Sequence, residues 1–319
     1  MLELSTRDAV RRIAGRYLAA AAKGLSRLEN PEDPKRLHAF RVAIRRLRSL
    51  LRSYKPWIGR VAGGRVRREL RELTRETNAA RDAEVQLEWL AGQYASLDRV
   101  ERPGCRWLIR KLDGRKRRAY RAIDDHYAAE AAEVAKRIRS RFKDREDSEP
   151  VAYREATAGL LEVGAARMRA RLEAIAGADD VKNVHRSRIQ VKRLRYLVEP
   201  LRKELPEARD VVSMLRQLQD LLGDLHDRHI LEAELARDVE DAAREKARRL
   251  HALAIAGRRD ALTRARQHDE QIGLVTLAAR ARMDRDRLHA RLGEDWSGRP
   301  GTLLDQQIGR LLRALAPPS

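Results

Sequence analysis

Apolar residues recur along most of the chain three or four positions apart, the spacing that places them on one side of an α-helix. Runs of β-branched residues are scarce, and glycine and proline fall in short clusters between the periodic segments. The pattern predicts an all-α fold. The expected helices span residues 5–28, 34–54, 61–94 and 104–142 in the first half and 151–175, 181–204 and 207–235 in the second, followed by further helical segments.

The order of the expected helices repeats in two halves of the chain, residues 1–147 and 148–319. The charged segment 143–150 ends in a proline and is expected to link the halves. Pro200 lies late in the expected helix 181–204 and should bend or end it. Four antiparallel helices in each half predict two four-helix bundles that are related by an approximate two-fold axis and together form one domain.

One basic helical segment occurs twice, at a constant offset of 147 residues. The first copy contains His38, Arg41, Arg45, Arg46 and Arg48, and the second contains His185, Arg188, Lys192, Arg193 and Arg195. Each residue of a helix turns the chain by about 100°, so most of these cations, with Arg52, fall within about 80° of the histidine and opposite an apolar stripe. Arg46 and Arg193 lie at the edge of the basic side. The two segments are termed the motif helices.

Both motif helices are expected to begin in the same way, since Asp33 and Asp180 each precede the motif histidine by five residues and can act as N-caps. The histidine then lies near the amide groups and the positive dipole end that attract anions. His38 and His185 could also be general acid–base groups, packing residues or metal ligands. We favour a hydrogen bond to an anion, because the neighbouring arginines repel a divalent cation.

The basic sides of the motif helices suit a linear phosphate ligand. Fixed guanidinium groups one helical turn apart match a run of phosphates, since each group can donate two charge-assisted hydrogen bonds. If a two-fold axis relates the bundles, both basic sides can face a shared groove. The alternative is that acidic residues of neighbouring helices neutralise them.

The composition also favours a polyanionic partner, because Lys and Arg outnumber Asp and Glu by 69 to 48 and the formal net charge is +21. Arginine-rich codon usage is the alternative explanation for scattered arginines, such as those between Arg237 and Arg266, but not for two matched motifs. The single cysteine, Cys105, excludes an internal disulfide and suits a reducing compartment. Without a leader or a membrane-spanning apolar run, we expect a soluble cytoplasmic protein with no membrane partner.

A second paired element follows each motif helix: Arg81-Asp82 in the first half and His226-Asp227 in the second. Asp82 and Asp227 either orient the basic side chains by hydrogen bonding or are solvated helix carboxylates. The His226-Asp227 pair also suggests a metal site, although the first half has Arg-Asp at that place. The sequence has no Walker-type glycine-rich loop, nucleophile elbow or dinucleotide fingerprint, so we expect no catalytic residues, metal or cofactor.

Four ordered motifs resemble the CHAD domain, the conserved histidine α-helical domain, and the resemblance covers nearly the whole chain. They are His38-x-x-Arg41-Val-x-x-Arg45-Arg46-Leu-Arg48, Ala80-Arg81-Asp82, His185-x-x-Arg188-x-x-x-Lys192-Arg193-Leu-Arg195-Tyr196 and Leu218-Gln219-Asp220-Leu221-Leu222-Gly223-Asp224-Leu225-His226-Asp227. The resemblance implies two four-helix bundles about a pseudo-two-fold axis, a basic central groove or pore, and binding of inorganic polyphosphate, often at polyphosphate granules. Many relatives also carry a triphosphatase domain with a Glu-x-Glu-x-Lys signature, which is not found near this N-terminus, so the chain resembles a stand-alone binding domain.

The resemblance assigns polyphosphate contacts to the basic residues and histidines of both motif helices. Arg52 joins them from its place on the helical wheel, with Arg81, Asp82 and Asp227 in supporting roles. Non-catalytic polyphosphate binding is therefore the favoured function. Nucleic-acid binding is an alternative that the aromatic content of 4% disfavours. A metal-dependent phosphohydrolase using His226, Asp227 and His229 is a second alternative.

Overall fold

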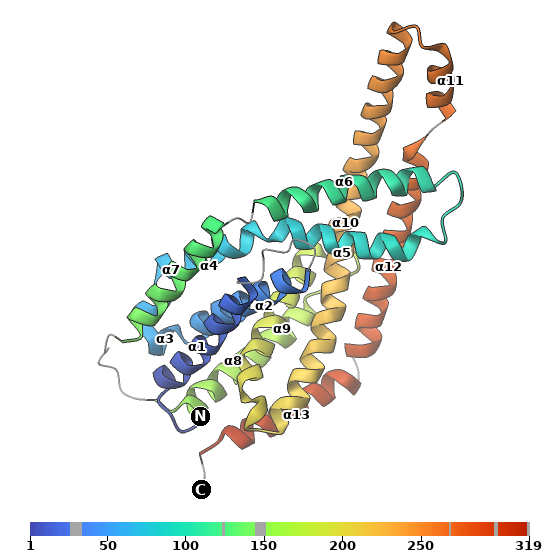
Figure 1. The fold of residues 1–319 in the computed structure, drawn as a ribbon. Helices are drawn as coiled ribbons and strands as arrows, with labels where there is room; N and C mark the ends of the chain where they lie inside the picture. The colour runs from blue at the N-terminus through green and yellow to red at the C-terminus, as the bar shows by residue number, and fades with distance from the viewer. Residues whose placement is uncertain (26–33, 123–124, 144–150, 268, 297–298, 318–319) are drawn as a thin grey trace.

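The structure is a computed structural model that describes residues 1–25, 34–122, 125–143, 151–267, 269–296 and 299–317. Within these ranges the fold is all-α, as predicted (Figure 1). The elements are α1 (Thr6–Leu25), α2 (Pro34–Ser53), α3 (Lys55–Ile58), the 3₁₀ turn η1 (Gly59–Ala62), α4 (Gly64–Glu76), α5 (Asn78–Tyr94), α6 (Arg102–Arg121), α7 (Asp125–Arg141), α8 (Tyr153–Glu173), α9 (Val181–Val198), the 3₁₀ turn η2 (Glu199–Lys203), α10 (Glu207–Ile255), α11 (Arg259–Gln267), α12 (Glu270–Trp296) and α13 (Arg299–Leu315).

The largest apolar cluster, termed the main core, is shared by both halves of the chain. α1, α2, α4 and α7 contribute to it from the first half, and α8, α9, the first part of α10 and α13 from the second. The two halves meet where Tyr54 stacks on Tyr153 with ring centroids 5.4 Å apart and its hydroxyl lies 2.7 Å from the Thr157 hydroxyl. The halves therefore do not have separate interiors.

A second apolar cluster, termed the outer core, lies where α5 and α6 cross the later part of α10 and α12 (Figure 1). Leu90, Leu108, Leu235 and Leu277 are among its buried residues. Beyond it, the end of α10 and α11 project from the body as an arm (Figure 1), and α11 has no buried residue. One helix, α10, thus contributes to both cores.

The structure divides two long helices that the sequence predicted. The segment 61–94 becomes α4 and α5, separated at Thr77, whose hydroxyl donates to the Thr74 carbonyl over 2.9 Å. Such a side-chain bond to the backbone competes with regular helical hydrogen bonding. The segment 104–142 becomes α6 and α7. Conversely, the predicted helix 207–235 continues to Ile255. It ends two residues before Gly257, which has a left-handed conformation with φ of 65°.

The predicted start of the second motif helix and the effect of Pro200 on its end are confirmed. α9 ends at Val198, and Pro200 lies in the 3₁₀ turn that follows. The Asp180 side chain caps α9 by accepting from the Asn183 amide over 3.1 Å. Asp33 and most of the predicted linker lie outside the described residues. The division at 147/148 and the two-fold axis remain predictions. No described helix is long and apolar enough to cross a membrane.

Candidate functional site: a basic cavity between the motif helices

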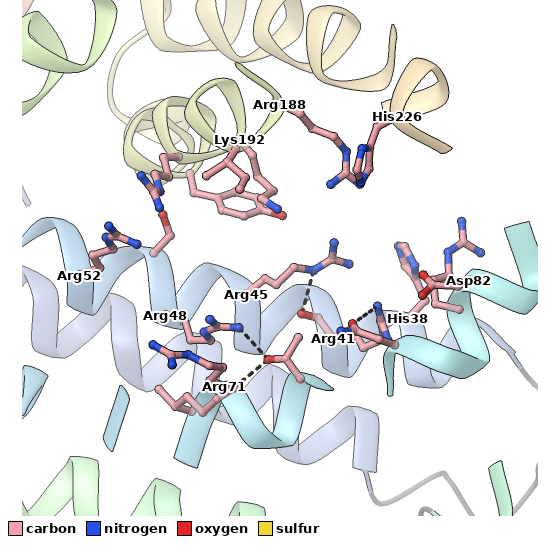
Figure 2. A pocket seen from close by; sticks show the side chains of 18 of the residues that line it. His38, Arg41, Arg45, Arg48, Arg52, Arg71, Asp82, Arg188, Lys192 and His226 are labelled. Atoms are coloured by element: carbon pink, nitrogen blue, oxygen red, sulfur yellow. Dashed lines mark hydrogen bonds between the residues drawn. The ribbon is translucent and has the colours of Figure 1, made fainter. Parts of the chain in front are cut away.

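A cavity of about 780 Å³, termed the basic cavity, lies between the motif helices α2 and α9 (Figure 2). Residues of α4, α5 and the middle of α10 complete its walls. The lining cations and histidines are His38, Arg41, Arg45, Arg48, Arg52, Arg67, Arg71, Arg81, Arg188, Lys192, Arg193 and His226. In the described part of the chain, Asp82 and Asp227 are the only carboxylates that line it.

The apolar side of each motif helix sets the direction of its basic side. On α2, Phe40 and Leu47 are fully buried in the main core, which turns the opposite side of the helix toward the basic cavity. On α9, Val184, Val191 and Val198 are fully buried in the same core. Because both helices pack on one core, their basic sides meet across one space, as the repeat predicted.

Arg41 is held at the break between α4 and α5. Its side chain is 5% exposed, and its Nη1 donates to the Thr77 carbonyl and, over 2.8 Å, to the Thr77 hydroxyl. Its Nη2 donates to Asn78 Oδ1 over 3.1 Å (Figure 2). Burial, and then the neighbouring Arg45, lowers the pKa of Arg41 to about 10. Arg41 therefore acts as a fixed positive charge in the wall of the cavity.

Arg45 and Arg48 extend further into the basic cavity (Figure 2). Arg45 Nε donates to the Arg41 carbonyl over 3.4 Å, and Arg48 Nη1 donates to the Thr74 hydroxyl over 3.2 Å. Burial is the largest cause that lowers the pKa of both side chains, and nearby arginines lower it further. Their hydrogen-bond partners are neutral oxygens, so neither charge is compensated by a carboxylate.

Lys192 enters the cavity from α9, opposite these arginines (Figure 2). Burial, followed by the charges of Arg188, Arg45 and Arg48, lowers its pKa from 10.5 to about 7. The pKa of Lys192 thus reflects first its burial and then the neighbouring positive charges. Among the described residues, no ion pair within 4.0 Å involves Arg45, Arg48, Arg52, Arg188, Lys192 or Arg193.

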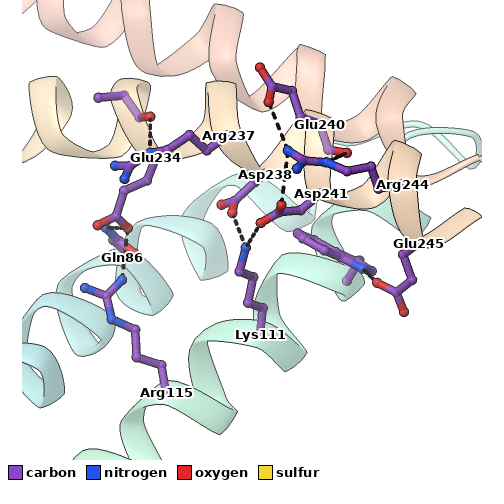
Figure 3. A network of polar contacts seen from close by, with 12 residues as sticks. Gln86, Lys111, Arg115, Glu234, Arg237, Asp238, Glu240, Asp241, Arg244 and Glu245 are labelled. Atoms are coloured by element: carbon purple, nitrogen blue, oxygen red, sulfur yellow. Dashed lines mark hydrogen bonds and ion pairs between the residues drawn. The ribbon is translucent and has the colours of Figure 1, made fainter.

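Cations elsewhere in the protein do have acidic partners. Near the outer core, Lys111 Nζ lies 2.6 Å from Asp238 Oδ1 and 2.9 Å from Asp241 Oδ2 (Figure 3). In the same network Arg115 pairs with Glu234 over 3.1 Å. The chain thus has carboxylates that reach buried or half-buried cations, and the basic cavity is a region where they are sparse.

The model of the CHAD domain family matches residues 12–236. The chain belongs to the CHAD domain family. Its fold is similar to the crystal structure of the CHAD domain from the plant Ricinus communis, with a TM-score of 0.61 and 19% identity over 100% of this chain and 95% of that one. It is also similar to PptA from Streptomyces chartreusis, with a TM-score of 0.64 and 18% identity over 92% of this chain and 100% of that one. The comparison with curated proteins yields no match.

Most of the predicted contact residues of this CHAD domain lie together. Eight of the eleven line the basic cavity, and the supporting residues Arg81, Asp82 and Asp227 line it as well. The other three, Arg46, Arg195 and His185, are not among the lining residues. Asp82 and Asp227 accept no hydrogen bond from a described residue. Burial raises the pKa of both carboxyls, and the charges of Arg41 and Arg188, respectively, lower it. Their supporting role remains a prediction.

Arg46 and Arg195 have partners inside this CHAD domain. Arg46 Nε donates to Glu199 Oε2 over 2.9 Å, and its Nη2 pairs with the second oxygen of Glu199. This bidentate pair joins α2 to the turn after α9. Arg195 is 8% exposed, donates from Nε to Gln219 Oε1 over 2.9 Å and lies over the Tyr196 ring. Both side chains therefore have protein partners, and a contact with the ligand, which the sequence predicted and the structure does not test, would require them to leave these partners.

Sequence reasoning missed several residues of the cavity. Arg67 and Arg71 of α4 line the basic cavity, but neither was among the predicted contact residues. Helical spacing alone could have found this, since 67 and 71 are one turn apart. Tyr196 also lines the cavity and is half of the Arg195-Tyr196 pair in the family motif. His226, whose role was open, lines it too.

Proposed function

We propose that the protein binds inorganic polyphosphate in the basic cavity and catalyses no reaction on it. The observation that carries the proposal is the gathering of ten Arg and Lys side chains around one space that only two carboxylates line among the described residues. Charges of one sign at such separations repel one another, and this repulsion, after burial, is a cause of the low pKa of Lys192. A polyanion supplies the missing negative charge.

The spacing of the cations favours a chain of phosphates over a single phosphate. Arg41, Arg45, Arg48 and Arg52 follow one another along α2, and all four line the basic cavity. At a rise of 1.5 Å per residue, the row is about 16 Å long. A single phosphate reaches only part of this row, whereas a linear polyphosphate places successive charges along it.

Polyphosphate fits the cavity better than a nucleic acid does. Single-stranded nucleic acids are bound mainly by basic grooves whose aromatic side chains stack on the bases. Tyr196 is the one Phe, Tyr or Trp residue among the lining residues in the described part of the chain. The cavity thus provides charge along a backbone but few platforms for bases.

The phosphohydrolase alternative has less support. His226 and Asp227 line the cavity, but His229 Nε2 lies 2.6 Å from the Ala178 carbonyl, outside the lining. Within the described ranges, no group of three or more His, Cys, Asp or Glu residues is placed to hold a metal ion. The neighbouring Arg188 and Lys192 also make the surroundings of His226 positive. These features support binding without hydrolysis.

The decisive experiment measures polyphosphate affinity by isothermal titration calorimetry for the wild type and for the Arg45→Glu/Lys192→Glu variant. We expect the variant to lose at least about 100-fold in affinity, because it reverses two charges at the centre of the cavity. The matched control is Arg106→Glu/Arg110→Glu, which changes the net charge equally on an exposed part of α6 outside the cavity. Equal losses of affinity in both variants would show that the effect depends on net charge alone, and would contradict the proposal.

Two further arms separate the alternative functions. Single-stranded RNA at equal phosphate concentration should not displace bound polyphosphate, and displacement would favour nucleic-acid binding. Incubation of the protein with polyphosphate and Mg²⁺ should release no phosphate, and release that Asp227→Ala abolishes would favour the phosphohydrolase. Circular dichroism of every variant checks that the helices are retained.

We also propose that this binding places the protein at polyphosphate granules in the cytoplasm. The same cavity that binds a free chain can bind one exposed at a granule surface. A fluorescent fusion should co-localise with stained granules, and the Arg45→Glu/Lys192→Glu variant should be diffuse. A variant that still co-localises would separate granule association from the cavity.

A further inference from the structure

The basic lining of the cavity continues onto the surface between α8 and α9, two helices that pack side by side (Figure 1). Arg193 lines the basic cavity, and it also lines a second, open groove of about 480 Å³. The other residues of this groove are Arg167, Ala170, Arg171, Ala174 and Gln190. One side chain thus borders both spaces, and the cavity and the groove adjoin at Arg193.

The sequence of α8 builds one wall of the groove. Its residues 167, 170, 171 and 174 follow the spacing that places side chains on one side of a helix. Two of them, Ala170 and Ala174, are small, so the space beside Arg167 and Arg171 stays open. The second wall is α9, from which Gln190 and Arg193 project. The groove thus has a defined shape.

Hydrogen bonds between α8 and α9 fix the two walls relative to each other. Gln190 Nε2 donates to the Gly164 carbonyl over 3.0 Å, and Ser187 Oγ donates to the Arg171 carbonyl over 2.7 Å. A Cβ atom at Gly164 would lie 2.8 Å from Leu194 Cδ1, so the glycine permits this close approach. Arg171 and Arg193 are therefore presented on a rigid pair of helices.

The arginines of the groove lack negative partners. Arg167 and Arg171 are exposed, and neither forms an ion pair with a described residue. Burial lowers the pKa of Arg193, and Arg52 and Arg171 lower it further. Arg52 lines the basic cavity and Arg171 lines the groove. A row of positive charge therefore runs from the cavity past Arg193 and along α8.

We propose that the groove lined by Arg167, Arg171 and Arg193 is a second binding site for a phosphate chain, which extends the cavity site along α8. The inference rests on the proposed function, since both sites take the same ligand. A short chain occupies the basic cavity alone, whereas a long chain continues past Arg193 into the groove. The second contact is then intramolecular, so the groove makes affinity depend on chain length.

The test compares tripolyphosphate with long-chain polyphosphate of one defined length, using the Arg167→Gln/Arg171→Gln variant. Its matched control is Arg106→Gln/Arg110→Gln, a pair with the same i, i+4 spacing that is also exposed and without an ion pair among the described residues. We expect the groove variant to bind the long chain about tenfold more weakly than the control does, and to bind tripolyphosphate equally well. Affinity falls as the salt concentration rises, and loss of two phosphate contacts should make the slope of log affinity against log salt shallower by about one to two.

The outcomes distinguish the groove from the proposed function. If the wild type binds neither probe, the proposed function fails and the groove site fails with it. If the wild type binds both probes but the groove variant matches the control with the long chain, the groove site alone is overturned. The Arg167→Lys/Arg171→Lys variant, which keeps both charges, should retain most of the long-chain affinity, and its failure to do so would contradict an electrostatic contact.

Discussion

His185 of α9 and His226 of α10 lie side by side, with Nδ1 of His185 3.3 Å from Nε2 of His226. The corresponding place in the first half is taken by His38 and Arg81, and the charge of Arg81 is among the causes that lower the pKa of His38. Burial, followed by Arg188 and His185, lowers the pKa of His226 to about 4. The two rings can share a hydrogen bond only while at least one of them is neutral.

The histidine pair predicts a pH dependence of both stability and binding below neutrality. Since the folded pKa values lie below the ordinary 6.5, the unfolded chain takes up more protons as the pH falls, and the free protein loses stability below about pH 6.5. Bound polyphosphate favours the charged rings, so affinity should rise as the pH falls from 7 to 5. Titration calorimetry across this range should show a weaker rise for His185→Gln/His226→Gln, and an unchanged profile would contradict the prediction.

Lys192 predicts a rise in stability on the alkaline side. Its pKa is about 7 in the folded protein and 10.5 in the unfolded chain, so between these values the unfolded chain binds more protons and the free energy of unfolding increases with pH. Lys192→Met should remove this increase and stabilise the free protein at pH 7 by on the order of 1 to 3 kcal/mol. Urea unfolding at several pH values measures both effects. A less stable Lys192→Met protein would show that the lysine supports the fold.

The same residue predicts the opposite dependence for binding. Polyphosphate favours the charged form of Lys192, so binding above about pH 7 takes up a proton, and affinity should fall as the pH rises toward 10. Arginine stays mostly protonated up to pH 9, since even the buried Arg41 has a pKa of about 10. Lys192→Arg should therefore bind with an affinity that changes less than about threefold between pH 7 and 9, as measured by titration in buffers of equal ionic strength. A decline as steep as that of the wild type would place the titrating group elsewhere.

The Arg46–Glu199 pair predicts a loss of stability without a loss of binding. The side chains are 30% and 10% exposed, and the pair joins the two halves of the chain. Arg46→Ala leaves a mostly buried carboxylate without its partner, which should cost about 1 to 3 kcal/mol in thermal or urea unfolding. Polyphosphate affinity should change less than about twofold, because Arg46 does not line the basic cavity. A large loss of affinity would show that the ligand competes with Glu199 for this guanidinium.

The fold class and the position of the basic cavity between the motif helices could be predicted from the sequence, because the spacing of apolar and basic residues is local to each motif helix. The apolar side of α2 packs on the main core and so turns Arg45 toward the basic cavity. The repeated pattern in α9 orients Lys192 in the same way. Local spacing cannot show which cations already have partners. Glu199, which pairs with Arg46, lies 153 positions away in the sequence, and Gln219 satisfies Arg195 from another helix.

Helix ends that depend on tertiary contacts could not be predicted from the sequence either. The helical pattern runs through Thr77 without glycine or proline. The helix is nevertheless interrupted there, and Arg41 donates a hydrogen bond to the Thr77 carbonyl. The length of α10 was underestimated for the opposite reason, since its later residues look like a solvated surface until α5, α6 and α12 are placed against them. The outer core therefore could not be deduced from the apolar pattern of any single segment.

The packing of α10 in both cores and of α13 in the main core has a practical consequence for dissecting the protein. α13 supplies Leu304, Ile308 and Leu311 to the main core, although it lies some way beyond residue 236, where the family match ends. A fragment trimmed to the matched residues would lose all of α12 and α13, the two C-terminal helices that pack against α10. Such a fragment should aggregate, so ligand studies require residues well past the recognisable domain.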